Sequence, residues 1–186
     1  MFIRSERLFL RPAWPEDRAE LLALIGDAAI VRNLADAPWP DRAEDADRFI
    51  AAPQDRLLPQ FLVTAPDGGG ARVVGGCGLS RREGEVSLGY WTARAEWGRG
   101  YATEAVRALL SLARALGHGR ILASHPVDNA VAGRVLDKVG FRRTGRVVER
   151  FSTGRGYAVP SREYELCLDS AAGCGGDDAA QDLRAA

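Results

Sequence analysis

The spacing of apolar and polar residues divides the first part of the chain into one strand and two helices. Apolar and charged residues alternate over 7–13 up to a proline, a pattern typical of a strand. Residues 15–25 begin with proline and acidic side chains and then place apolar residues at helical spacing, which predicts a helix. A second helical pattern follows over 41–51, after a break that contains two prolines.

The same spacing predicts strands in the middle of the chain. Residues 59–66 and 72–80 are rich in apolar side chains and flank a glycine-rich turn, so they predict a hairpin. A further strand is expected over Gly84–Trp91. We therefore expect a meander of strands, with the two helices inserted after its first strand.

Helical and strand patterns alternate in the second half. Apolar residues gather on one helical face over 100–116 and predict a helix that Gly117 ends. Another helix is expected over 128–140, with Asp128 or Asn129 as its N-cap. The strands expected around these two helices are 120–125, 141–151 and 161–169.

One domain accounts for most of the chain. Strands before and after a strand–helix–strand unit predict an α+β (mixed α/β) fold with a single central sheet over residues 1–168. The residues 169–186 are small and acidic and have almost nothing to bury, so they predict a disordered tail.

The composition excludes several classes of function. With 25 basic and 25 acidic residues the formal charge is zero, which argues against a nucleic-acid partner. No apolar run is long enough to span a membrane, and the N-terminus is too charged for a signal peptide. Cys77, Cys167 and Cys174 show no metal-ligand spacing and are expected to be reduced thiols. A cytoplasmic protein without a metal site is therefore expected.

The segment "EWGRGYATEA" places two glycines and Arg99 directly before a predicted helix. N–H groups at a helix N-terminus bind phosphate, and Arg99 offers a charge-assisted contact. The segment lacks the lysine of a P-loop and fits the dinucleotide fingerprint poorly. A glycine-rich turn without a ligand is the alternative interpretation.

Two further segments give the glycine loop a context. In order, the chain contains "LGYW", "WGRGYATEA" and "DNAVAGRVLDKVGF", after the opening "RSERLFLRPAWPED". Together they resemble the GNAT superfamily of acetyl-CoA-dependent N-acetyltransferases, and most closely the branch of the Rim-type ribosomal-protein N-terminal acetyltransferases. The resemblance covers residues 4–168. It implies a mostly antiparallel sheet with a splayed parallel strand pair, about four helices, and acetyl-CoA as co-substrate.

The resemblance also implies which residues bind the co-substrate. The main chain of Tyr90, Trp91 and Thr92 is expected to pair with pantetheine. Asn129 is expected to hydrogen-bond the pantetheine arm. The residues expected to wrap the pyrophosphate are Trp97, Gly98, Arg99, Gly100, Tyr101, Ala102 and Thr103, and those expected near the adenosine end or its 3′-phosphate are Arg134 and Lys138.

Simpler roles remain open for several of these residues. Asn129 also suits an N-cap, and Arg134 and Lys138 suit a solvated helix face. Trp91 and Trp97 are equally typical of core aromatics. Trp39 lies where the family builds its acceptor pocket, and a role as a buried staple is as well supported. The early helices and the loop 152–164 are expected to shape that pocket.

The catalytic residues are less well defined by the resemblance. The backbone N–H of Tyr90 or Trp91 is expected to polarise the thioester carbonyl. The position at which the family often carries a glutamate base is Ser87, and Glu85 lies on the same face of the strand, either to act through water or as a solvent-facing carboxylate.

The family's acid is also missing. Where relatives carry a serine or a tyrosine, this chain has Ala132 and Leu136. Either solvent protonates the thiolate, or His125 or Tyr164 takes over that role.

The sequence therefore predicts an N-acetyltransferase in which an amine attacks acetyl-CoA directly. The acceptor is left open between a protein N-terminus, an amino acid and another small amine, and the protein is expected to be a monomer or a homodimer. A catalytically silent acyl-CoA-binding module is the alternative that the missing hydroxyls favour.

Overall fold

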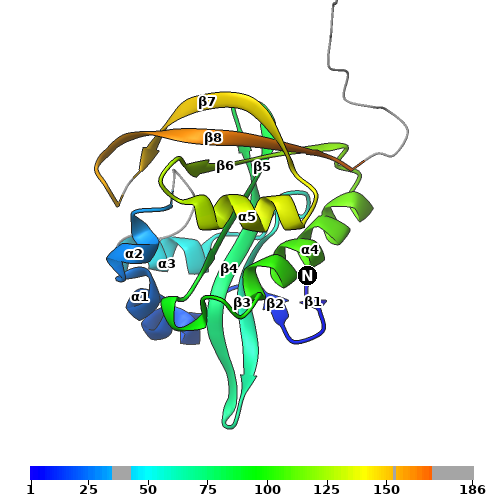
Figure 1. Ribbon diagram of the computed structural model, residues 1–186. Coiled ribbons are helices and arrows are strands. Elements are labelled where there is room, and N and C mark those ends of the chain that lie inside the picture. The colour runs from blue at the N-terminus through cyan, green and yellow to red at the C-terminus, as the bar shows by residue number, and fades with distance from the viewer. Residues whose placement is uncertain (35–42, 153, 169–186) are drawn as a thin grey trace, which may run out of the picture.

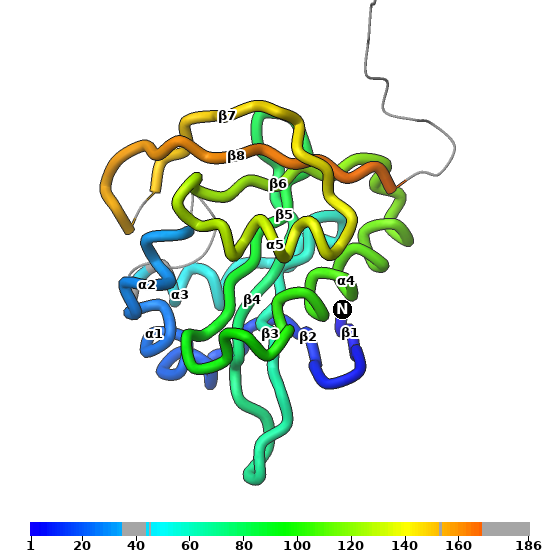
Figure 2. Tube along the Cα trace, viewed as in Figure 1, coloured from blue at the N-terminus to red at the C-terminus, as the bar shows by residue number. Residues whose placement is uncertain are grey.

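A computed structural model describes residues 1–34, 43–152 and 154–168. Within this part of the chain, eight strands form one sheet in the order β1-β2-β3-β4-β5-β6-β8-β7 (Figures 1 and 2). The strands are β1 (Ile3–Arg4), β2 (Phe9–Arg11), β3 (Gln60–Asp67), β4 (Gly70–Arg82), β5 (Glu85–Thr92), β6 (Arg120–Pro126), β7 (Arg142–Ser152) and β8 (Tyr157–Cys167). The helices are α1 (Arg18–Ile25), α2 (Ala28–Val31), α3 (Ala43–Ala51), α4 (Tyr101–Ala115) and α5 (Ala130–Lys138). The predicted α+β fold with one central sheet is confirmed.

The helix α2 is the one that the sequence did not predict. It is a single turn, and its N-cap Asp27 accepts a hydrogen bond from the N–H of Ala29 at 2.8 Å. Four residues are too few to show an apolar period, so the cap was its only signal in the sequence.

Helices cover both faces of the first half of the sheet, because successive strand residues point to opposite sides. Phe61 and Val63 of β3 belong to the core cluster that includes Val106 and Leu109 of α4. Leu62, between them, belongs to the cluster shared with α1 and α3. In Figure 1, α4 and α5 lie in front of the sheet, and α1–α3 gather to its left.

One pair of neighbouring strands in the described sheet, β5 and β6, departs from the antiparallel arrangement. These strands run parallel, and their ladder consists of Ser87↔Leu122 and Leu88↔Ala123. β5 continues to Thr92 in full register with β4, so it leaves β6 after two pairs. This is the splayed parallel pair that the resemblance implied.

The last strand, β8, is longer than predicted, whereas β7 has the predicted length. β8 begins at Tyr157, which pairs with Ser152 of β7. The register shifts between Arg143 and Val147, where Gly145 has a φ of +81°. Much of the segment 152–164, expected to be an acceptor-binding loop, is therefore a strand.

The expectation that all three cysteines are reduced is wrong, because Cys167 is disulfide-bonded. Cys77 is a free thiol, and its burial raises its pKa to about 12. Trp39 and the predicted tail 169–186 lie outside the described residues.

The described residues form neither a membrane-spanning helix nor a cluster of metal ligands. No described helix is long and apolar enough to cross a membrane. No group of three or more His, Cys, Asp or Glu side chains in the described ranges is placed to hold a metal ion.

A buried ion pair fixes the entry to α1. Arg11 donates to both carboxylate oxygens of Asp17 at 2.6 and 2.7 Å, and Asp17 also accepts from the N–H of Trp14 at 2.7 Å. Burial alone raises the pKa of the Asp17 carboxylate, but the hydrogen bonds from Arg11 and Trp14 outweigh it, so that pKa is lowered.

We expect Asp17→Asn to lower the free energy of unfolding by about 3 kcal/mol, because it leaves the buried Arg11 guanidinium without its counter-charge. The exposed pair Arg18–Asp47 provides the control, and Asp47→Asn should change stability far less. Urea unfolding measures both. Since the folded pKa of Asp17 lies below its unfolded value, its contribution is complete above about pH 4 and is lost as the pH falls further. Equal effects of the two variants would contradict a structural role for the buried pair.

Candidate active site

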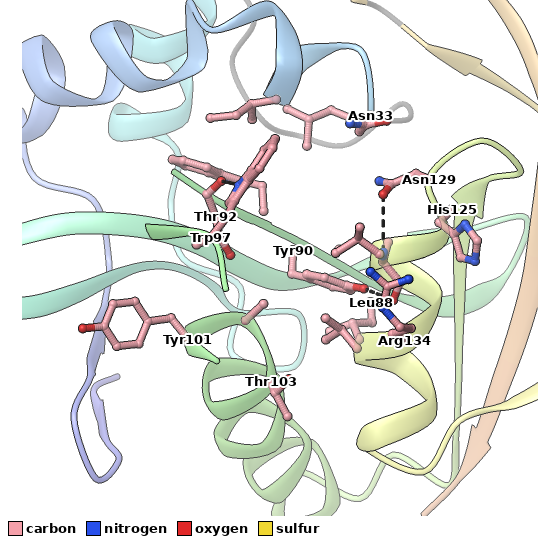
Figure 3. Close-up of a pocket in the computed structure, with 18 of the residues that line it drawn as sticks. Asn33, Leu88, Tyr90, Thr92, Trp97, Tyr101, Thr103, His125, Asn129 and Arg134 are labelled. Atoms are coloured by element: carbon pink, nitrogen blue, oxygen red, sulfur yellow. Dashed lines mark hydrogen bonds between the residues drawn. The ribbon is translucent and has the colours of Figure 1, made fainter. Parts of the chain in front are cut away.

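A cavity of about 630 Å³ opens where β5 and β6 part. Its walls come from both faces of the sheet, with α2 and β4 on one side and the first turn of α4 and helix α5 on the other (Figure 3). Two molecules that enter from opposite faces can therefore meet at the gap between the strands.

The strand β5 turns main-chain groups toward this gap. Ala93 donates its N–H to the carbonyl of Val74 at 2.9 Å, so in the antiparallel ladder the alternate residue Trp91 also faces β4. Tyr90 and Thr92 therefore direct their N–H and C=O groups to the opposite side, where the parallel ladder has already ended. Of the three residues predicted to pair with pantetheine, Trp91 therefore directs its main-chain N–H and C=O toward β4 and not toward the gap.

The glycine loop has the backbone that its sequence predicts. Gly98 and Gly100 have φ values of +79° and +80°, a region that disfavours residues with a Cβ atom. Gly100 is the N-cap of α4, and the N–H of Glu104 bonds to its carbonyl at 3.1 Å. The N–H groups of residues 101–103 precede that first helical bond, so they have no partner within the helix. Both glycines and residues 101–103 line the cavity.

Arg7, which is distant in the sequence, holds this loop through a hydrogen bond and a cation–π contact. Its Nη1 donates to the carbonyl of Arg99 at 3.1 Å, and its guanidinium lies 4.9 Å from the centre of the Tyr101 ring. Glu104 holds Arg7 in place, because it accepts from the Arg7 N–H at 2.7 Å and from Nε at 2.8 Å. Ser5 donates to the same carboxylate at 2.7 Å. Burial raises the pKa of Glu104, but these hydrogen bonds outweigh it and lower that pKa.

The predicted role of the Arg99 side chain is not supported by its position. Its guanidinium pairs with the buried carboxylate of Glu96 at 3.2 Å, and Arg99 is not among the residues that line the cavity. Arg72 reaches the same carboxylate, also at 3.2 Å. Glu96 does line the cavity, although no sequence motif predicted a role for it there.

Helix α5 forms another part of the cavity wall. Asn129 is its N-cap, and its Oδ1 accepts the N–H of Ala132 at 3.4 Å (Figure 3). The predicted cap is confirmed, and the same residue lines the cavity.

The two predicted cations of α5 also lie at the cavity. Arg134 and Lys138 both line it. Lys138 further lines a second cavity that includes Gly100 and carries Arg4 and Arg107. Arg4, Arg107 and Lys138 therefore place positive charge beside Gly100, in a cavity that also includes Glu6 and the Arg7-paired Glu104.

The two tryptophans differ in their surroundings. The Trp91 side chain is buried in the cluster beneath α1 and α3, as a core aromatic would be. Trp97 is 52 % exposed, and its Nε1 donates to the Thr92 carbonyl at 2.8 Å. This bond ties the start of the glycine loop to the end of β5.

Comparison with known proteins now identifies the family. The model of the acetyltransferase (GNAT) domain family matches residues 7–142. This chain belongs to the GNAT family. It is an acetyltransferase with acetyl-CoA as its acyl donor.

Individual relatives are distant. A Bacillus licheniformis protein named N-acetyltransferase p20 is 25% identical over 178 residues, which cover 91% of this chain and 97% of that protein. A GNAT acetyltransferase from Bacillus anthracis superposes with a TM-score of 0.74 at 23% identity, over 90% of this chain and 99% of that one. Mycobacterium smegmatis RimJ, solved with a CoA disulfide, gives 0.72 at 19% identity, over 90% and 87%. A Rim-type enzyme therefore shares this fold.

His125, a predicted catalytic residue, has both ring nitrogens engaged. Nδ1 lies 2.8 Å from the carbonyl of Pro126, so it must carry a proton, and Nε2 lies 3.4 Å from the hydroxyl of Tyr164. That hydroxyl accepts from Nε of Arg143 at 3.1 Å and is left to donate to Nε2. Burial lowers the pKa of His125, which favours this neutral form. The arrangement suits a structural histidine better than an acid.

Of two candidate catalytic positions on β5, Ser87 lines the main cavity and Glu85 does not. Ser87 lines the main cavity and also a smaller one of about 220 Å³. Glu85 lines the smaller cavity alone, where it is half exposed and pairs with Arg120 at 3.7 Å. The structure does not bring Glu85 to the gap.

The side of the cavity on the α2–β4 face was not found from the sequence. It is formed by Asn33, which follows α2, by Gln60 of β3, and by Ser80 and Arg82 of β4. The Gln60 Nε2 donates to the Leu79 carbonyl, and its Oε1 has no hydrogen-bond partner among the described residues. These residues have no motif in common, and only the fold brings them together.

The glycine loop can be tested with two matched glycines. Gly117 ends α4 with a φ of +84°, so Gly117→Ala and Gly100→Ala strain the backbone equally, by about 1 kcal/mol. We expect only Gly100→Ala to weaken CoA binding, by at least tenfold in calorimetry, because its methyl group hinders the approach of phosphate to the N–H groups of α4. Equal CoA affinity in the two folded variants would show that the loop is only a turn.

A second variant tests His125. We expect His125→Gln to lower the melting temperature, because it breaks the chain from Arg143 through Tyr164, and to lower kcat by less than ~100-fold. Steady-state kinetics and thermal melting measure the two effects. A larger loss of kcat at unchanged CoA affinity would assign the acid role to His125.

Proposed function

We propose that this protein transfers the acetyl group of acetyl-CoA to the α-amino group of an amino acid, peptide or protein N-terminus, by direct attack of the amine. The observation that carries the proposal is the cavity at the parting of β5 and β6, which is open to both faces of the sheet. A donor on the α4–α5 face and an acceptor on the α2–β4 face can then react without a covalent enzyme intermediate.

The donor side is assigned from main-chain and helix-terminal groups. Tyr90 and Thr92 direct their main-chain groups into the gap and suit the pantetheine amides, together with Asn129. The glycine loop suits the pyrophosphate, since its positive-φ glycines leave room beside unpartnered N–H groups at a helix N-terminus. Arg134 and Lys138 suit the adenosine end and its 3′-phosphate.

The main-chain N–H of Tyr90 is the group that we assign to the thioester carbonyl. It faces the gap, whereas the N–H of Trp91 faces β4. A fixed N–H donor in a site shielded from water stabilises the oxyanion that forms when the amine attacks.

The choice of an α-amino acceptor follows from the acids at the site. Among the described residues that line the cavity, Glu96 is the single carboxylate, and Arg72 and Arg99 already neutralise it. No described carboxylate is therefore placed at the gap to deprotonate the amine. Near pH 7.5 roughly a third of an α-amino group is neutral, against about one in a thousand for a lysine side chain. An acceptor that deprotonates without help fits this site.

Two peptides of identical sequence test the proposal. One has a free α-amino group and a blocked lysine, and the other has a blocked N-terminus and a free lysine. We expect kcat/KM for the first to be at least tenfold higher in a CoA-release assay, and to rise with pH up to the pKa of the amine, near 8.

The outcomes separate the parts of the proposal. Preference for the lysine peptide would mean that a base operates at the site, and the α-amino assignment would be wrong. Absence of turnover with amino acids, peptides and small amines, in a protein whose melting temperature CoA raises, would contradict acetyl transfer to amines but not co-substrate binding.

A further inference from the structure

Helix α5 has no hydroxyl group to offer the departing sulfur. Its nine residues include no serine, threonine or tyrosine. Relatives carry a hydroxyl at one of two positions of this helix. Here one of them, Leu136, is fully buried in the core, and the other, Ala132, lines the cavity near the start of the helix. Any hydroxyl near this turn must therefore come from another element.

Tyr90 supplies one from the opposite wall. Its side chain extends from β5 toward α5, and its hydroxyl donates to the carbonyl of Ala132 at 2.8 Å (Figure 3). Tyr90 lines the cavity and lies two residues beyond Leu88, the last residue of β5 that pairs with β6. The hydroxyl thus lies within the gap, at the first turn of α5.

We propose that the Tyr90 hydroxyl is the hydrogen-bond donor to the sulfur of CoA. It comes from strand β5 and takes the place of the hydroxyl that helix α5 lacks. The inference rests on the proposed function, since it requires pantetheine in the gap. The Ala132 carbonyl then serves as the resting partner, which the hydroxyl exchanges for the sulfur as negative charge develops there.

The step balances without any further reactant. The acceptor nitrogen forms a bond to the carbonyl carbon, the carbon–sulfur bond breaks, and its electron pair goes to the sulfur. The proton lost by the nitrogen passes through solvent and ends on the sulfur as the thiol. Tyr90 is protonated before and after, and burial raises the pKa of its hydroxyl, so it stays a donor while the thiolate forms.

The neighbouring tyrosine is a suitable control. Tyr164 is fully buried, and its hydroxyl is held between Arg143 and His125. It is not a cavity-lining residue. Tyr164→Phe removes a buried hydroxyl of the same kind from a residue that does not line the cavity, and any effect that it has through His125, which does, is measured separately by His125→Gln.

The first measurement uses bound CoA and needs no acceptor. The rate at which a small alkylating reagent modifies the thiol of bound CoA, followed against pH, reports the pKa of that thiol. We expect this pKa to rise by about one unit in Tyr90→Phe, a tenfold change in ionisation, because the thiolate loses its donor. Tyr164→Phe should leave it unchanged. An unchanged thiol pKa in Tyr90→Phe, with CoA still bound, overturns the inference whatever the acceptor is.

The second measurement is turnover with the best α-amino substrate. We expect Tyr90→Phe to lower kcat by about 100-fold at similar KM for acetyl-CoA, and Ala132→Ser in that background to recover at least tenfold by returning a hydroxyl from the helix. A role that only ties β5 to α5 predicts a lower melting temperature and weaker CoA binding without a change in kcat, and this result would refute the inference. If Tyr90→Phe retains full turnover, only the role of the Tyr90 hydroxyl is refuted. If the wild type shows no turnover, the proposed function is refuted.

Discussion

The structure depends on one interruption of hydrogen bonding, the end of the parallel ladder after Leu88↔Ala123. A sheet that continued would use the main-chain groups of Tyr90 and Thr92 for pairing and would leave no opening between its faces. Because β5 instead follows β4 and leaves β6, those groups face a cavity. The Thr92 carbonyl already accepts from Trp97 Nε1. A ligand with amides of its own can satisfy the remaining groups as an added strand does.

A second constraint is electrostatic. A second cavity beside the glycine loop is lined by Lys138, Arg4 and Arg107, and the unpartnered N–H groups of α4 lie at the main cavity next to it. A buried carboxylate at such a place would repel a phosphate, and Glu96 avoids this because two arginines neutralise it. Glu104 is likewise committed to Arg7. The acids near the loop therefore shape it without opposing an anionic ligand.

Local signals predicted the frame of the site. The period of apolar residues gave the strands and long helices, and Gly100, Gly117 and Asn129 mark helix ends where the sequence placed them. The sequence does not reveal which side of a strand a given N–H faces, so Tyr90 and Trp91 were equally good candidates until the register with β4 separated them.

Other parts of the site depend on contacts between distant segments. Arg7 and Glu104 are 97 positions apart, and no spacing rule links them. His125 was a reasonable acid from its chemical type, but its role depends on Tyr164, Arg143 and the carbonyl of Pro126, which only the fold brings together. Side-chain chemistry without its partners is therefore a weak guide to catalysis.

Asn129 shows how folding and ligand binding can favour the same residue. Serine, threonine and aspartate would cap α5 as well as asparagine does. Asparagine alone among them keeps an NH₂ group after its oxygen has accepted the N–H of Ala132. If that group contacts pantetheine, as we propose, selection for a stable helix and selection for binding act in the same direction, and the position escapes the usual conflict between stability and activity. An aspartate here would preserve the helix and lose the donor, which is how a folded but poorly binding member of such a family can arise.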